Sequence, residues 1–178
     1  QAASITRAAI QQAIKASEGG RGRDAEYIIP FWVSDPGIGK TTGLKDLAKS
    51  MGMNAIHLIG SEYDASELGG WVLPVEGTER MKRKVPDWYA DADWSVPTLL
   101  ILDELAQSSL PVQNLYARLV NEHRIGPHIL PDNCYIVAAG NRTSNRAGTI
   151  PIPTHLRDRL LFLEIDADVS DTVHYFNA

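Results

Sequence analysis

The feature that most constrains this fold is a glycine-rich run, SDPGIGKTT (34–42), placed between an apolar segment and a helical one. The preceding segment, YIIPFWV (27–33), is continuously apolar, which is typical of a buried parallel strand. Beyond the run, apolar residues recur at helical spacing: Leu44, Leu47, Ala48 and Met51. A loop between a strand end and a helix start gathers backbone N–H groups, so this stretch favours binding of an anion.

The glycine-rich run matches the phosphate-binding pattern G-x-x-x-x-G-K-[ST], except that Ser34 stands at the first glycine. In this pattern the glycines let the backbone close around phosphate oxygens, Lys40 reaches the β and γ phosphates, and Thr41 places a hydroxyl on Mg²⁺. Ser34 strains the loop only if its backbone needs a positive φ. We favour a strained or neutral serine over one whose hydroxyl orders the loop. The residues expected to bind the nucleotide are Asp35, Pro36, Gly37, Ile38, Gly39, Lys40, Thr41 and Thr42.

Two further apolar segments end in polar side chains. LLILDE (99–104) ends in Asp103 and Glu104, and an open α/β sheet binds its ligand at the carboxyl ends of its strands. We therefore expect Asp103 to hold Mg²⁺ through water and Glu104 to act as general base on the attacking water. CYIVAAGN (134–141) delivers Asn141, whose amide can bond the γ-phosphate and the water. Because asparagine is also common in turns for its own sake, Asn141 counts only together with the acids.

Strand-like and helix-like segments alternate along the chain, which predicts one α/β domain over 1–178 with three layers and a five-stranded parallel sheet. A helix is expected at about 4–17 and an insertion at about 69–97. Within 61–97 we expect a short helix followed by a hairpin. The five expected strands cover 27–33, 54–59, 98–104, 134–141 and 160–165.

The composition limits the classes of partner and the cellular compartment that we expect. The net charge of −5 argues against a general nucleic-acid or anionic-membrane binder, because such partners recruit a basic surface. No run approaches about 18 uninterrupted apolar residues, so no membrane association is expected. Cys134 is the only cysteine, which excludes an intramolecular disulfide and suits the cytoplasm. The histidines lack the spacing of a zinc site.

Taken together, the motifs resemble those of the AAA+ ATPases, and within them the MoxR-like or dynein-related group of bacteria and phages. SDPGIGKTT is similar to Walker A, LLILDE to Walker B and AAGNR (138–142) to sensor 1. The resemblance implies ATP and Mg²⁺ as cofactors, a hexameric ring of identical subunits, and a protein substrate or adaptor. It also implies an arginine finger from IPTHLRDRLLFLEID (152–166), with Arg159 as the candidate and Arg157 as the alternative. Either arginine can instead be a solvated cation at a helix end.

Two other segments resemble places where such rings form pore-facing loops, SEYDASELGGW (61–71) and RIGPHILPD (124–132). RMKRK (80–84) is then either a grip for an acidic partner or translocated chain, or a solvated hairpin tip. The chain departs from the family's pattern at Ser34. It departs again at DVSDTVHYFNA (168–178), where the helical lid domain is expected to begin.

The leading hypothesis is therefore a ring-forming ATP hydrolase that remodels a protein partner. Two alternatives stay open: a nucleotide-binding module that uses ATP only to order an assembly, and a DNA-acting motor. Glu104 and Asn141 favour hydrolysis, because a pure binder needs neither. The net negative charge of the chain argues against a DNA-acting motor.

Overall fold

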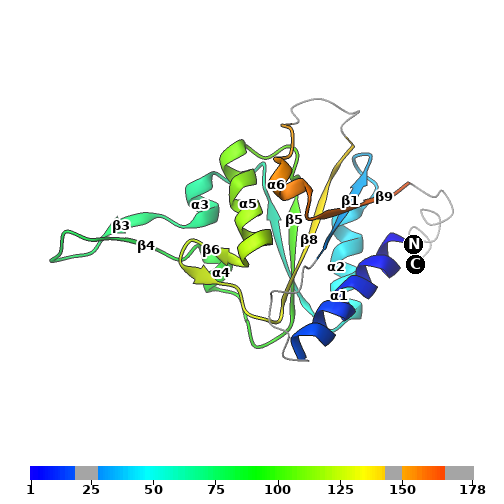
Figure 1. Ribbon diagram of the computed structural model, residues 1–178, viewed down its shortest axis with the longest axis horizontal. Coiled ribbons are helices and arrows are strands. Elements are labelled where there is room, and N and C mark those ends of the chain that lie inside the picture. The colour runs from blue at the N-terminus through cyan, green and yellow to red at the C-terminus, as the bar shows by residue number, and fades with distance from the viewer. Residues whose placement is uncertain (19–27, 143–149, 167–178) are drawn as a thin grey trace.

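The computed structural model describes residues 1–18, 28–142 and 150–166, and a five-stranded parallel sheet forms its centre (Figure 1). The strand order is β2-β5-β8-β1-β9, so the last strand of the chain lies beside the first. This confirms the predicted parallel α/β sheet. Its strands are β1 (Ile29–Ser34), β2 (Asn54–Ile59), β5 (Thr98–Asp103), β8 (Cys134–Asn141) and β9 (Leu160–Glu164). The segment 168–178, where a lid is expected to begin, lies outside the described residues.

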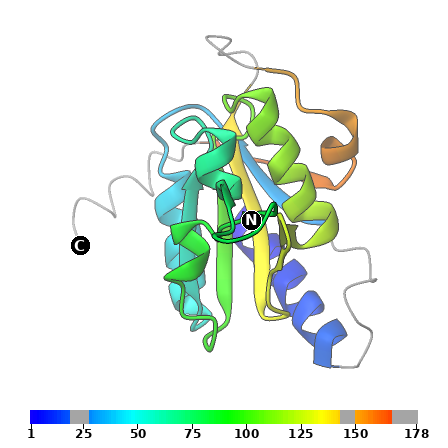
Figure 2. The same ribbon diagram turned by 90° about the vertical axis from the view of Figure 1, so that its left-hand side faces the viewer.

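Helices cover both faces of the sheet, and Figure 2 shows α2 and α5 on opposite sides of it. Alternation along β5 explains the two layers: Leu99 and Ile101 join the apolar cluster under α1 and α2, whereas Leu100 and Leu102 join the cluster under α5 and α6. The helices are α1 (Ala2–Glu18), α2 (Lys40–Ser50), α3 (Ala65–Gly69), α4 (Asp87–Ala90), α5 (Leu110–Glu122) and α6 (Thr154–Arg157).

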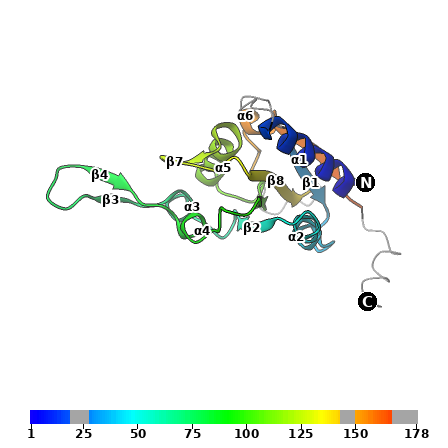
Figure 3. The ribbon, with the colours of Figure 1, turned by 90° about the horizontal axis from the view of Figure 1, so that it is seen from below.

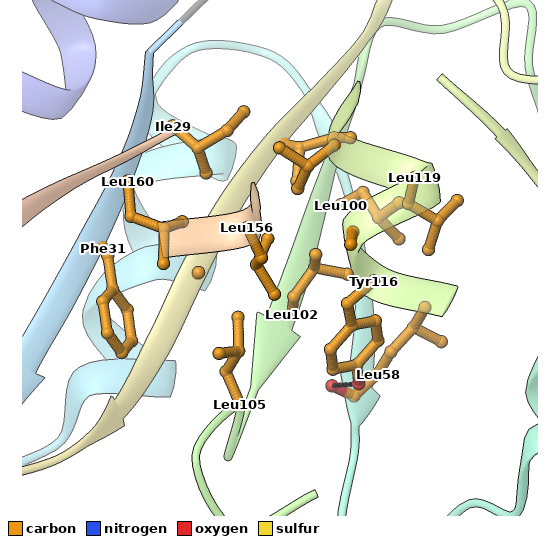
Figure 4. Close-up of a cluster of buried hydrophobic side chains, with 14 of the residues drawn as sticks. Ile29, Phe31, Leu58, Leu100, Leu102, Leu105, Tyr116, Leu119, Leu156 and Leu160 are labelled. Atoms are coloured by element: carbon orange, nitrogen blue, oxygen red, sulfur yellow. Dashed lines mark hydrogen bonds between the residues drawn. The ribbon is translucent and has the colours of Figure 1, made fainter. Parts of the chain in front are cut away.

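The larger of the two clusters fixes the position of α5 over the centre of the sheet (Figure 4). Tyr116 is fully buried there, and its hydroxyl donates to the backbone carbonyl of Leu58 on β2 at 3.2 Å. Burial raises the pKa of this phenol far above its ordinary value, so it stays a neutral donor. Ile29 and Leu160, the first residues of β1 and β9, belong to the same cluster as Leu156 of α6.

The insertion after β2 contains the expected kinds of element. A capping box, in which Asp64 and Glu67 bond each other's backbone, begins α3. Strand β3 (Val72–Pro74) then pairs antiparallel with β4 (Met81–Arg83), and this two-stranded ribbon extends away from the body (Figures 1 and 3). A second hairpin, β6 (Arg124–Ile125) with β7 (His128–Ile129), precedes β8. None of the helices in the described ranges has the length and apolarity needed to cross a bilayer.

Candidate functional site

The glycine-rich loop lies at the carboxyl edge of the sheet, where β1 ends and α2 begins (Figure 1). Ser34 and Asn141 are register partners there, so the ends of β1 and β8 lie side by side. Gly37 and Gly39 both have φ near 81°, which a side chain strongly disfavours. Gly39 is the N-cap of α2 and no side chain caps it. The exposed loop residues are Asp35, Pro36, Gly37, Gly39 and Thr42, whereas Ile38, Lys40 and Thr41 are half-buried.

Lys40 bridges the loop and the two strand ends. Its Nζ donates to Ser34 Oγ at 2.7 Å, to Asn141 Oδ1 at 2.9 Å and to the Asp35 carbonyl at 3.2 Å. These three acceptors match the three protons of the ammonium group. Burial lowers the pKa of Lys40 below its ordinary value, although nearby carboxylates, Asp103 first, act in the opposite direction. The structure thus brings Lys40 and Asn141, which come from two different predicted segments, into direct contact.

The prediction that Ser34 strains the loop is wrong. Ser34 is the last residue of β1, it is fully buried, and it is absent from the described non-glycine residues with positive φ, which are Glu104 and His123. Its hydroxyl donates to the Asp35 carbonyl at 2.9 Å while accepting from Lys40. The position is a strand residue whose side chain holds the lysine, so a glycine would relieve nothing here.

Asp103, at the end of β5, meets the loop through Thr41. The Thr41 hydroxyl donates to Asp103 Oδ2 at 2.6 Å, and His57 Nε2 on the adjacent strand β2 donates to the same oxygen at 2.9 Å. Burial raises the pKa of Asp103, but hydrogen bonds from Thr41, His57 and the Glu104 backbone outweigh it and leave the pKa below its ordinary value. The carboxyl group is therefore an anion at neutral pH.

The oxygen atoms of Thr41 and Asp103 are a donor set that suits Mg²⁺, a hard cation with a preference for oxygen. Within the described parts of the chain, no group of three or more histidine, cysteine, aspartate or glutamate residues could hold a metal ion. Mg²⁺ that binds through one carboxylate and one hydroxyl takes its other ligands from water and phosphate, as in nucleotide sites. The residues present fit a Mg²⁺–nucleotide complex better than a resident metal centre.

Glu104 follows Asp103 with a φ of 53°, a left-handed conformation that is costly for a residue with a side chain. Its backbone carbonyl accepts from the N–H groups of Gln107 and Ser108, so it opens a tight turn. Its carboxylate accepts a hydrogen bond from the hydroxyl of Ser61, which follows β2. The turn aims the Glu104 side chain across the strand ends toward β2.

The structure does not bring Arg159 to this site. Its carbonyl accepts from the Ile29 N–H at 2.9 Å, at the amino edge of the sheet. From there β9 (Leu160–Glu164) runs four residue steps, roughly 13 Å, beside β1 before it reaches the loop edge. Arg157 is exposed, and its guanidinium lies 5.9 Å from the ring centroid of Phe162. The backbone of Arg159 therefore lies at the opposite edge of the sheet from the glycine-rich loop of its own chain.

Three residues near the loop escaped the sequence analysis. His57 lies within an apolar strand, and Ser61 lies within the segment 61–71 that was expected to form a pore-facing loop. Only the pairing of β2 with β5 brings these two residues to Asp103 and Glu104. Arg142 directly follows Asn141 at the end of a predicted strand, and this position could have identified it as a residue near the site.

Arg142 ties the loop to β9. Its backbone N–H donates to the Ser34 carbonyl at 3.0 Å, and its guanidinium lies 3.8 Å from both Asp35 and Glu164 and closer still to Asp166. The hydrogen bond to Asp166, together with the surrounding carboxylates, raises the pKa of Arg142 above its ordinary value. The guanidinium therefore remains a fixed positive charge beside the glycine-rich loop.

No family model and no curated protein matches this sequence. Solved structures do match its fold. A protein of Cytophaga hutchinsonii assigned as an ATPase gives a TM-score of 0.61 at 16% identity over 99% of this chain and 56% of its own. The P216G mutant of RuvB from Thermotoga maritima gives 0.54 at 18% identity over 92% of this chain and 46% of its own.

At these identities the comparisons establish the fold. The predicted three-layer α/β architecture with a five-stranded parallel sheet is confirmed, and the two solved structures share this fold. The chain spans about half the length of the solved structures it matches.

Proposed function

We propose that this chain is the nucleotide-binding unit of an AAA+ ATPase of the MoxR-like or dynein-related group, and that it binds and hydrolyses ATP with Mg²⁺. One observation carries the proposal: the contacts of Lys40 with Asn141 and of Thr41 with Asp103 draw the glycine-rich loop onto the ends of β8 and β5. A glycine turn that served packing alone would not need a half-buried lysine and a buried carboxylate converging on it.

The loop residues hold the phosphates in this proposal. Backbone N–H groups of 37–41 surround the phosphate oxygens, and Lys40 exchanges its present acceptors for the β and γ phosphates. Thr41 and Asp103 hold Mg²⁺, which when bound neutralises charge that develops on the phosphates. The Asp103 carboxyl is suited to this because its lowered pKa keeps it ionised at neutral pH.

Glu104 and Asn141 act on the attacking water. Glu104 accepts its proton as general base, and the Asn141 amide orients the water against the γ-phosphate. In the present arrangement Ser61 holds the Glu104 carboxylate and Lys40 holds the Asn141 amide oxygen. Phosphate binding by Lys40 releases the Asn141 amide oxygen, and separation from Ser61 frees the whole Glu104 carboxylate for the water.

Arg159 acts in trans in this proposal. Its place at the amino edge of the sheet, far from its own loop, supports insertion into the nucleotide site of a neighbouring subunit. A head-to-tail contact of this kind closes into a ring when the rotation between subunits allows it, here a hexamer. The ring couples hydrolysis to remodelling of a protein partner, and the single cysteine suits a cytoplasmic setting.

One observation favours a second candidate, a module that binds ATP to order an assembly without turnover. The bond from Ser61 engages the Glu104 carboxylate, and a base held in this way leaves a nucleotide bound and intact. Turnover measured on the parental protein separates the two candidates.

The test uses two variants and a matched control. Lys40→Ala should weaken binding of a non-hydrolysable ATP analogue by about tenfold or more, because the phosphate charge loses its main partner. Glu104→Gln should bind the analogue like the parent and stop hydrolysis. Lys45→Ala, an exposed lysine on α2, should change neither. Undiminished affinity in Lys40→Ala would remove the phosphate-loop assignment, and parental turnover in Glu104→Gln would require another base.

A further inference from the structure

The β3–β4 ribbon has two faces of different chemistry. The register pairs Val72 with Arg83, Leu73 with Lys82 and Pro74 with Met81. Backbone bonds from Lys84 N to the Trp71 carbonyl at 2.7 Å and from Val75 N to the Arg80 carbonyl at 2.9 Å extend this ladder at both ends. Directly paired residues of antiparallel strands share a face, and successive pairs alternate between faces. One face therefore carries Trp71, Leu73 and Val75 opposite Lys84, Lys82 and Arg80.

This apolar–basic face is solvent-exposed along its whole length. Trp71 is 56%, Leu73 43% and Val75 36% exposed. The three cations opposite them are exposed as well. A row of apolar side chains left in water beside a row of cations marks an interaction surface rather than a packing surface.

The root of the ribbon is fixed, so the face is presented in a defined direction. Arg83, on the other face, donates to the carbonyls of Gly69 and Gly70 and packs against Gly126 in the β6–β7 turn. Gly70 has a φ of 83°, and a Cβ there would lie 1.9 Å from the Lys84 carbonyl oxygen. Because Arg83 and Gly126 engage the opposite face, the apolar–basic face points away from the β6–β7 hairpin.

We propose that the apolar–basic face binds an extended polypeptide segment in which acidic and apolar side chains are combined. A strand laid along the ribbon presents side chains at the same two-residue repeat, about 6.6 Å, as the ladder itself. Its carboxylates can then lie on Lys82, Lys84 and Arg80 while its apolar side chains cover Trp71 and Leu73. The cations favour an acidic segment by charge complementarity, and the apolar row requires that this segment also carry apolar side chains.

The same chemistry argues against nucleic acid and anionic membrane as the occupant. Glu76 and Glu79 occupy the end of the ribbon and would face phosphate oxygens. Single strands bind on several aromatic rings that stack successive bases, whereas this face offers only Trp71.

The inference supplies the chemistry of the protein partner in the proposed function, and it rests on that function only for the existence of such a partner. Binding to the ribbon needs no nucleotide, so it is measured without ATP. A failure of the peptide test leaves the ATPase proposal standing, and loss of turnover leaves the ribbon inference standing.

The probe is a fluorescent synthetic peptide in which pairs of glutamates alternate with pairs of leucines, so that each face of the extended strand carries both side chains. It is titrated with the full chain and followed by anisotropy. It should bind, and hydrogen exchange should slow at 71–75 and 80–84. The double variant Lys82→Glu/Lys84→Glu should weaken binding by about tenfold or more. Lys15→Glu/Lys49→Glu, which makes the same charge change at exposed lysines on α1 and α2, should keep the parental affinity within about twofold.

Two further variants separate the faces. Leu73→Ser should weaken peptide binding, whereas Met81→Ser, on the Arg83 face and 61% exposed, should not. Circular dichroism confirms that each variant stays folded. The inference is overturned if the acidic peptide does not bind or if both double variants lose affinity equally. It is also overturned if a lysine–leucine peptide, oligo(dT) or phosphatidylserine vesicles bind more tightly than the acidic peptide.

Discussion

At the residue scale, Ser34 shows how one hydroxyl organises the loop. It accepts from Lys40 Nζ at 2.7 Å and donates to the Asp35 carbonyl at 2.9 Å from a fully buried strand position. A glycine there would lose both bonds and add backbone freedom to the unfolded chain.

Ser34→Gly should lower the free energy of unfolding by about 2–3 kcal/mol, the sum of the two lost hydrogen bonds and the entropic cost of glycine in a strand. Urea unfolding of the nucleotide-free protein measures this. Ser34→Ala, which removes only the hydroxyl, should show the part of the loss that is due to the hydrogen bonds. A glycine variant more stable than the parent would mean that serine does strain the backbone.

Asp103 gives the site a pH dependence. Hydrogen bonds hold its pKa below the ordinary value of 3.8, so the unfolded chain binds this proton more readily than the folded chain. The stability that the ionised carboxylate supplies is complete above pH 3.8 and is lost as the pH falls through the lower folded value.

Asp103→Asn should therefore be less stable than the parent at neutral pH and should lose less stability on acidification. Urea midpoints measured from neutral pH to below 3.8 test this. Asp46→Asn, an exposed position on α2, should follow the parent. If Asp103→Asn and the parent lose stability in parallel, the carboxylate is not held by its three donors.

At the scale of elements, the strands were predictable because each is a short apolar run bounded by polar or turn residues, as β5 and β8 show. The position of Asp103 and Glu104 at a strand end followed from the same pattern. The partners of these acids did not, because His57 and Ser61 reach them only through the pairing of β2 with β5. Neither could the conformation of Ser34 be predicted, since a motif gives residue types but no dihedral angles.

Helix α1 also shows a contact that periodicity cannot reveal. Its apolar face was predictable, and Ile10 is fully buried. The buried Thr6 hydroxyl additionally accepts from Trp32 Nε1 on β1 at 2.8 Å. This bond satisfies an indole N–H that would otherwise be buried without a partner.

Thr6→Val, which keeps the side-chain shape, should destabilise the chain by about 1–3 kcal/mol because the Trp32 N–H is left unsatisfied. Thr6→Ser, which keeps the hydroxyl, should cost less. Urea unfolding followed by tryptophan fluorescence measures both. Equal stability of the valine variant and the parent would show that α1 is held by apolar packing alone.

At the scale of the whole molecule, the sheet separates two groups of candidate site residues, one at each of its edges. The glycine-rich loop, Asp103 and Asn141 lie at the carboxyl ends of the strands, while Arg159 lies at the amino end of β9. A single chain therefore carries the proposed phosphate site and the candidate finger at opposite edges of its sheet. If hydrolysis needs both, two chains must be in contact, and each contributes one half of the site.

This division predicts complementation between inactive variants. Glu104→Gln lacks the base but keeps the arginine, whereas Arg159→Ala keeps the base but lacks the arginine, so each alone should bind ATP and fail to hydrolyse it. Mixed subunits place an intact phosphate site beside an intact Arg159, and the mixture should hydrolyse ATP faster than either variant. Arg157→Ala should stay active by itself, because that side chain lies over the ring of Phe162. A mixture no more active than its components would place Arg159 outside the catalytic site of any subunit.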